Sequence, residues 1–262
     1  MRQSNGYIVL FTVVLTVICA GALAGAFEGL KGLHKNNVAL DKKKQILSAV
    51  MDLEGMKGEE VSAKYKATIS AVSVDPQGEV LPDVDAEKIN TVKVFKEKDP
   101  SKKVFPVFIY ANGDEVAYIL PMEGNGLWDA VSGYIAMDSD LNTIKGVSFA
   151  HKGETPGLGA RITDKPVRNR FVGKQIFDVD GTTLMGVAFQ KGEKIDYSNE
   201  PHKVDGLAGA SMTTEGVNAM LLSYFKSYEP YFIKVKGEST TSRKEEVKLV
   251  EEPAPMLSLI HI

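Results

Sequence analysis

The sequence predicts an α+β protein with one N-terminal transmembrane helix, and three features carry this prediction. The first is an almost wholly apolar run at residues 7–27. The second is a series of short, β-prone stretches between residues 104 and 149, each bounded by Gly, Asn or Asp. The third is a helical pattern near the end of the chain, where apolar residues recur at i, i+3, i+4, i+7, i+8 and i+11 from Val217 to Tyr228. Together they predict an anchor followed by one mixed domain.

The apolar run is long enough to cross a bilayer. No charged residue occurs from Gln3 to Phe27, and roughly 20 helical residues span the hydrocarbon core. A cleaved signal peptide is the alternative, because A-L-A at 22–24 and A-G-A at 24–26 resemble cleavage sites, but Arg2 is the only basic residue before the run. The length of the run favours an uncleaved anchor. The lysines that follow the run do not determine on which side a long domain lies.

The rest of the chain divides into predicted elements by periodicity and by turn residues. An amphipathic helix is expected at 37–53, a second helix at 59–70 and a Pro/Gly/Asp-rich connection at 76–88. Asn112-Gly113-Asp114 predicts a hairpin turn. The remaining expected elements are strands at 104–110, 116–120, 133–137, 143–149 and 182–189, a short helix at 165–173, and a last helix that starts between 211 and 214. The resulting segments are an anchor (1–30), a helical and connecting segment packed on the body (31–103), an α+β domain (104–236) and a disordered tail (237–262).

Composition excludes several classes of function. A net charge of -3 gives no basic surface for nucleic acid. The single cysteine, Cys19, allows no internal disulfide and no zinc or iron–sulfur site built from this chain alone. The four histidines, at positions 34, 151, 202 and 261, do not occur at metal-ligand spacing. We therefore expect no metal centre and no nucleic-acid partner.

The stretch V-D-G-L-A-G-A-S-M-T-T-E-G-V at 204–217 places two glycines and three hydroxyls ahead of the last predicted helix. Up to four N–H groups at a helix start lack partners. A hydroxyl from Ser211, Thr213 or Thr214 can cap them. Alternatively, Gly206 and Gly209 let the backbone approach a phosphate at the positive end of the helix. The residues alone leave both interpretations open.

Two further segments combine glycines with groups able to contact a flat ligand. The loop at 151–160, H-K-G-E-T-P-G-L-G-A, follows a strand and is either a binding loop or an ordinary connection. The segment P-M-E-G-N-G-L-W at 121–128 contains the only tryptophan, Trp128. Leu127 and Trp128 either line a planar ring or pack in the core.

Taken together, I-L-P-M-E-G-N-G-L-W (119–128), G-E-T-P-G-L-G (153–159) and D-G-L-A-G-A-S-M-T-T-E-G-V (205–217) resemble the C subunit of bacterial sodium-translocating NADH:quinone reductases. The resemblance extends from the anchor to about Ile233. It implies an FMN that is attached by a phosphoester to a hydroxyl residue by a separate, FAD-dependent flavin transferase. The G subunit of the related Rnf-type electron-transport complex shares this domain and is an alternative.

The family motif, Ser/Thr-Gly-Ala-Thr-x-Thr, corresponds to residues 208–213. The acceptor position falls on Ser211, where the family usually has Thr, and Thr213 is the alternative acceptor. A serine hydroxyl forms the same ester. The cofactor-binding residues that the resemblance implies are Ser211, Thr213, Asp205, Ala208, Gly209, Ala210, Met212, Gly126, Leu127, Trp128, Glu154, Thr155, Pro156, Gly157, Leu158 and Gly159.

The resemblance also implies a location and a mechanism. We expect a single-pass protein of the bacterial inner membrane whose domain lies on the extracytoplasmic side and whose partners are membrane lipid, the other subunits of the complex and the flavin transferase. The FMN would relay electrons between redox centres, and hydride transfer from NADH would occur elsewhere, since no G-x-G-x-x-G follows a strand here. No catalytic residue is expected. A membrane-anchored binding or scaffold domain without a redox role is the alternative from another class.

Overall fold

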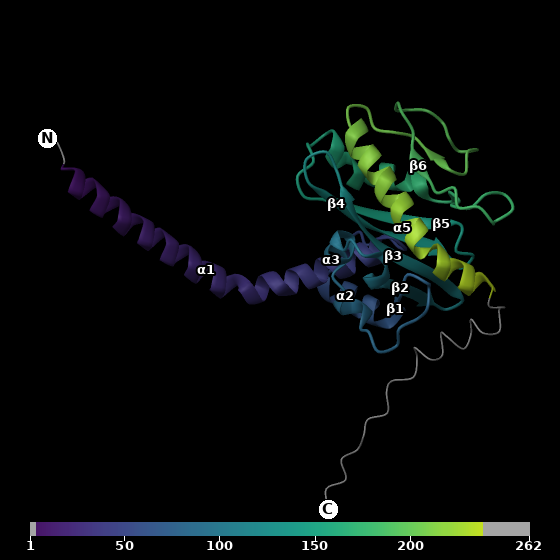
Figure 1. Ribbon diagram of the computed structural model, residues 1–262, viewed down its shortest axis with the longest axis horizontal. Coiled ribbons are helices and arrows are strands. Elements are labelled where there is room, and N and C mark those ends of the chain that lie inside the picture. The colour runs from purple at the N-terminus through teal and green to yellow at the C-terminus, as the bar shows by residue number, and fades with distance from the viewer. Residues whose placement is uncertain (1–3, 238–262) are drawn as a thin grey trace, which may run out of the picture. The chain divides into compact units, whose positions relative to one another are not determined.

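The computed structural model describes residues 4–237. Contacts divide the chain into two compact units, Met1–Lys43 and Lys44–Ile262. Helix α1 (Asn5–Ser48) forms the first unit and continues into the second (Figure 1). The predicted disordered tail lies outside the described residues, except that Gly237 is the last residue of the final helix.

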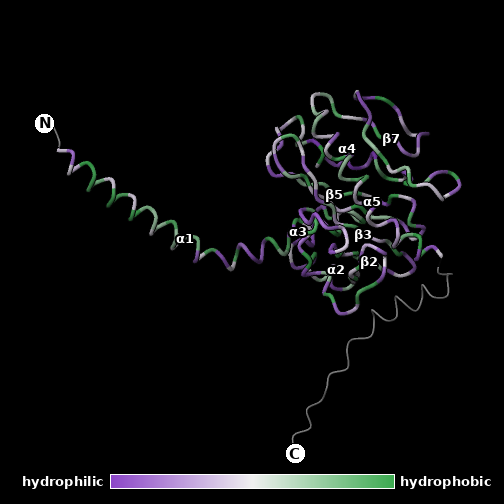
Figure 2. Tube along the Cα trace, in the orientation of Figure 1, coloured by the Kyte–Doolittle hydropathy of each residue, from purple (hydrophilic) through white to green (hydrophobic). Residues whose placement is uncertain are grey.

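Helix α1 is continuous where the sequence predicts an anchor and a separate amphipathic helix. No proline interrupts residues 5–48, so nothing in the sequence breaks the helix between them. Its first half is apolar and exposed (Figure 2), and it is the one helix within residues 4–237 that is long and apolar enough to cross a membrane. The helix ends at Ser48, five residues before the predicted end.

A five-stranded antiparallel sheet forms the centre of the second unit, with its strands in sequence order. Its strands are β1 (Ile69–Val74), β2 (Phe105–Asn112), β3 (Glu115–Asn125), β4 (Ala130–Asp138) and β5 (Ile144–His151). Asn112 pairs with Glu115, and Gly113 adopts φ +64° in the two-residue turn between them. The predicted hairpin and the four strands between residues 104 and 149 are confirmed.

The first strand was not predicted. Helix α2 (Gly58–Thr68) ends at Thr68, and I-S-A-V-S-V at 69–74 pairs with β2 instead of extending the helix to Ser70. Three short helical segments also occupy the connection between β1 and β2, namely η1 (Ala86–Lys88), α3 (Thr91–Lys96) and η2 (Pro100–Lys102). Each begins after an Asp or Asn whose side chain accepts a hydrogen bond from the backbone of the segment.

The segment after the sheet contains little regular structure. It begins with η3 (Gly159–Thr163), α4 (Lys165–Arg168) and η4 (Asn169–Phe171), and Gly173 ends the last turn with φ +78°. The predicted short helix is thus present as two consecutive pieces. The predicted strand at 182–189 is wrong except for its last two residues, β6 (Ala188–Phe189), which pair in parallel with β7 (Lys203–Val204).

Helix α5 (Ser211–Gly237) packs mainly on β3 and covers one face of the sheet (Figure 1). The predicted apolar face is buried, including Val217, Leu221, Phe225 and Tyr228. Helix α2 packs on β1 and β2. Because α5 is held along its length by this core, the position of its first turn is determined by the fold.

Candidate functional site

The first turn of α5 presents free hydrogen-bond donors. The helix begins at Ser211, and the N–H groups of Ser211, Met212 and Thr213 have no acceptor among residues 4–237. The preceding residue, Ala210, has no polar side chain with which to cap them. Unpaired N–H groups at a helix start carry a partial positive charge and attract an anion.

The three hydroxyls of this turn do not cap the helix. Thr213 donates to Glu154 Oε2 at 2.6 Å, and Thr214 donates to the carbonyl oxygen of Ser211 at 2.9 Å. The Ser211 hydroxyl is exposed and has no hydrogen-bond partner in the described part of the chain. Hydroxyl capping, the simpler of the two sequence interpretations, is therefore wrong.

Glu154 connects the three sequence segments that were predicted to form a site. Its carboxylate accepts the Thr213 hydroxyl through Oε2 and the Trp128 N–H, at 3.0 Å, through Oε1. Glu154 is only 4 % exposed. Burial by itself raises the pKa of this carboxyl, but the hydrogen bonds from Thr213 and from backbone N–H groups hold the pKa below its ordinary value. Glu154 is thus an ionised, buried link between α5, its own loop and the segment around Trp128.

Two glycines provide the space that the Glu154 carboxylate occupies. A methyl group on Gly126 or Gly159 would overlap one of its oxygens. These glycines, both predicted as cofactor contacts, lie against Glu154. The His151 ring accepts the N–H of Glu154 through Nδ1 at 3.3 Å.

Large apolar side chains are exposed on all three segments. They are Leu127 and Trp128 after β3, Leu158 in the loop after β5, and Met212 in the first turn of α5. Trp128 is 71 % exposed, so the alternative that it packs in the core is wrong. Leu158 lies beside the loop before Ser211, because a Cβ on Gly209 would come within 2.8 Å of its Cδ2. Exposed apolar groups around a polar site are suited to binding a planar ring.

Thr155, Pro156 and Gly157, three further predicted site residues, form a turn. The Thr155 carbonyl oxygen accepts the N–H groups of Leu158, at 3.1 Å, and Ala160, at 3.2 Å. Gly157 adopts φ +75°, a conformation that favours glycine. The turn positions Leu158 and Gly159, which contact the rest of the site.

The loop at 205–210 is held by charged side chains that the sequence did not indicate. Both oxygens of Asp205 accept backbone N–H groups, from Lys194 at 2.9 Å and from Ile195 at 3.0 Å. Arg170 donates to the carbonyl oxygens of Asp205 and Gly206. Asp205 thus fixes the loop to the segment at Lys194 and Ile195. Gly206 lies against the carbonyl oxygen of Gln190, which a Cβ would overlap.

A cavity of about 510 Å³ opens beside Ser211. Its lining includes Phe189, Lys191, Tyr197 and Asn218, none of which the sequence motifs contain. Asn218 is fixed by two hydrogen bonds to the backbone of Phe189. No signal in the sequence indicates these two residues. An apolar residue such as Phe189, or a polar residue seven positions into a helix such as Asn218, is too common to indicate a site.

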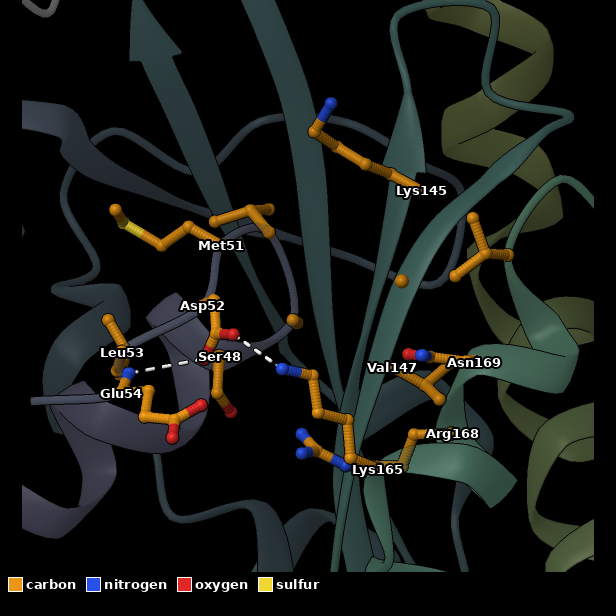
Figure 3. Close-up of a pocket in the computed structure, with 14 residues that line it drawn as sticks. Ser48, Met51, Asp52, Leu53, Glu54, Lys145, Val147, Lys165, Arg168 and Asn169 are labelled. Atoms are coloured by element: carbon orange, nitrogen blue, oxygen red, sulfur yellow. Dashed lines mark hydrogen bonds and ion pairs between the residues drawn. The ribbon is translucent and has the colours of Figure 1, made fainter.

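A second cavity, of about 320 Å³, lies apart from the three segments, between residues 48–54, β5 and α4 (Figure 3). Lys145, Lys165 and Arg168 line it, and Lys165 forms an ion pair with Asp52. It contains no residue of the predicted site. Within residues 4–237, no cluster of His, Cys, Asp or Glu side chains could hold a metal ion.

Comparison with known proteins identifies the family of the chain. Residues 126–225 match the model of the FMN-binding domain, a range that begins at Gly126 and includes Glu154 and Ser211. The C subunit of the Na(+)-translocating NADH-quinone reductase of Yersinia pestis is 32 % identical over 234 residues, which cover 82 % of this chain and 86 % of that protein. The equivalent protein of Pseudomonas aeruginosa is 31 % identical, over 84 % of this chain and 91 % of that protein.

Solved structures give the same result. The crystal structure of the C subunit of the Na(+)-translocating NADH-quinone reductase from Parabacteroides distasonis superposes with a TM-score of 0.68 at 35 % identity, covering 78 % of this chain and 96 % of that one. The structure of Shewanella oneidensis NqrC gives a TM-score of 0.65 at 25 % identity, covering 76 % and 97 %. The chain therefore belongs to the NqrC family, the C subunits of the Na+-translocating NADH-quinone reductase, an oxidoreductase complex, and carries the FMN-binding domain.

Proposed function

We propose that this chain is a membrane-anchored electron carrier of the reductase complex, with FMN attached through a phosphoester to Ser211. The observation that carries the proposal is the state of the first turn of α5. Ser211 offers an exposed hydroxyl without a partner among the described residues, beside three N–H groups that lack acceptors there. Thr213, the alternative acceptor, is 1 % exposed and already donates to Glu154.

The residues around Ser211 suit both ends of FMN. The free N–H groups of the first turn would hold the phosphate and offset its charge. Leu127, Trp128 and Leu158 expose apolar surface that would shield the isoalloxazine ring, while Glu154 keeps their segments together. FMN supplies the electron chemistry when it is bound, and the protein holds it in place.

Attachment is a group transfer in which Ser211 is the nucleophile. The Ser211 oxygen forms a bond to the FMN-side phosphorus of FAD, the pyrophosphate P–O bond breaks and AMP leaves. The hydroxyl proton passes to a base of the flavin transferase. No oxidant or reductant is consumed. A covalent link would prevent loss of the cofactor from a domain on the extracytoplasmic side of the inner membrane, where we place it, with α1 as its single anchor.

The test is in-gel flavin fluorescence of the denatured full-length chain, produced in cells that contain the flavin transferase, followed by mass mapping of the peptide with Ser211 and Thr213. We expect a fluorescent band with an FMN-sized adduct on Ser211 and none in Ser211→Ala. The matched control is Ser223→Ala, an exposed serine on the same helix, which should keep the adduct.

An adduct on Thr213 would contradict the choice of acceptor. A dark band with an unmodified peptide would contradict covalent attachment. If the native chain also lacked noncovalent flavin, the scaffold alternative would hold.

A further inference from the structure

Four charged side chains enclose the loop that leads to Ser211. They are Arg161 in η3, Arg170 in η4, Glu193 after β6 and Asp205 after β7. Arg161 donates to both oxygens of Glu193, and Arg170 lies 3.4 Å from Asp205 Oδ2 and 3.8 Å from Glu193 Oε1. The side chains of Glu193 and Asp205 are each 15 % exposed. These residues, called the loop network below, are thus mostly shielded from water.

The loop network binds the backbone of the loop itself. Arg170 donates to the carbonyl oxygens of Asp205, at 2.9 Å, and Gly206, at 2.6 Å. Glu193 accepts the N–H of Ala208 at 3.0 Å. The Ala210 N–H then donates to the Leu207 carbonyl oxygen, and Ser211 begins the helix one residue later. The network therefore determines the path of the chain into the proposed acceptor.

The charges of the loop network argue against a direct role in holding phosphate. Two arginines and two carboxylates sum to zero net charge, and each guanidinium already faces a carboxylate. The Arg161 guanidinium, followed by the Ala208 N–H, lowers the pKa of Glu193 to about 2, so this carboxylate is ionised at neutral pH. A neutral, internally paired cluster orders backbone more readily than it attracts an anion.

We propose that Arg161, Arg170, Glu193 and Asp205 are positioning residues for flavin attachment, which hold the 205–210 loop so that the Ser211 hydroxyl is presented to the flavin transferase. The proposal rests on the function proposed above. Misplacing a nucleophile by about 1 Å can lower a rate on the order of 100-fold. Loosening the loop therefore slows the transfer although no network residue touches the flavin.

The experiment measures the rate of flavin incorporation into the purified, detergent-solubilised full-length chain by the flavin transferase, with FAD as donor. The variants are Arg170→Gln, Arg170→Lys and the milder Glu193→Gln. The matched controls are Lys145→Gln and Glu115→Gln, which break a partly buried ion pair between β5 and the start of β3. Each chain is first checked for an unchanged circular dichroism spectrum and a cooperative thermal transition.

We expect Arg170→Gln and Glu193→Gln to lower the incorporation rate at saturating FAD by about 10- to 100-fold. The KM for FAD should not change, because FAD binds the transferase. Arg170→Lys should recover part of the rate through its remaining charge. The two control variants should incorporate flavin at the wild-type rate.

Wild-type incorporation rates in the network variants would overturn the proposal. An equal loss of rate in the two control variants would also overturn it, because it would indicate a general effect of lowered stability. The wild-type chain tests the proposed function separately. If it carries no flavin on Ser211, the proposed function is wrong, and the positioning proposal that rests on it is wrong as well.

Discussion

The Thr213 hydroxyl donates a 2.6 Å hydrogen bond to the Glu154 carboxylate, and both residues are almost completely buried. This contact joins the first turn of α5 to the loop after β5 across 59 residues of sequence. Glu154 in turn accepts the N–H of Trp128. A single carboxylate thus links the three segments of the site, so we expect its loss to affect both stability and the flavin site.

Replacing the Glu154 carboxylate should destabilise the second unit. Glu154→Gln removes the charge and turns an NH2 group toward donors that need an acceptor, so we expect a loss of about 1–3 kcal/mol in the free energy of unfolding. Thr213→Val should cost a similar amount because it leaves the carboxylate without its hydroxyl partner. Urea unfolding of the full-length chain measures both. Glu215→Gln, an exposed carboxylate in the same helix turn, is the control and should be nearly neutral.

The contribution of Glu154 should depend on pH in a defined direction. Its pKa is held below the ordinary value of 4.5 in the folded state. The stabilisation is therefore present above the unfolded pKa and is lost as pH falls through the folded pKa. We expect the stability difference between wild type and Glu154→Gln to be largest near pH 7 and to shrink as the solution is acidified below about pH 4. A difference that grew on acidification would contradict an ionised Glu154.

The exposed tryptophan offers an optical test of where the flavin ring lies. Trp128 is the only tryptophan in the chain. If the ring lies beside it, tryptophan emission should be strongly quenched in the flavin-bearing wild type and restored in Ser211→Ala. Because Trp128 is mostly exposed, Trp128→Ala should change stability by no more than about 0.5 kcal/mol. Equal emission from the two chains, with the adduct confirmed by mass, would place the ring elsewhere.

Much of the fold was predictable because the relevant signals are local. The hairpin at Gly113 and the apolar face of α5 each depend on residues close together in the sequence, and both are confirmed. Strand β1 was missed because it directly follows helix α2 (Gly58–Thr68) and the pairing that ends the helix comes from β2, which begins 31 residues beyond Val74. The strand expected at 182–189 is wrong for the converse reason, since only its last two residues pair as a strand and Leu184 forms no more than an isolated bridge with Phe177.

The site was predictable in its segments but not in its contacts. Motifs identified residues 126–128, 154–159 and 205–213, and the structure joins them through Glu154. They could not show that Thr213 is buried and Ser211 exposed, since both are hydroxyl residues of the same helix turn. Arg170 and Glu193 lie outside every motif, and only the folded chain brings them to the loop.

The packing of α5 against the end of β3 gives a last prediction. Gly216 lies so close to Asn125 that a methyl group on it would overlap the Asn125 carbonyl oxygen. Gly216→Ala must therefore push the helix away from the segment that continues into Gly126 and Trp128, at a cost of about 1–3 kcal/mol. An alanine in an exposed helix position would instead stabilise the chain. Because the shift separates Trp128 from Ser211, the variant should also recover part of the tryptophan emission that the flavin quenches. Thermal unfolding and tryptophan emission spectra of Gly216→Ala measure the two effects, with Ser223→Ala as the control. If Gly216→Ala were as stable and as quenched as wild type, α5 would not control the distance between these segments.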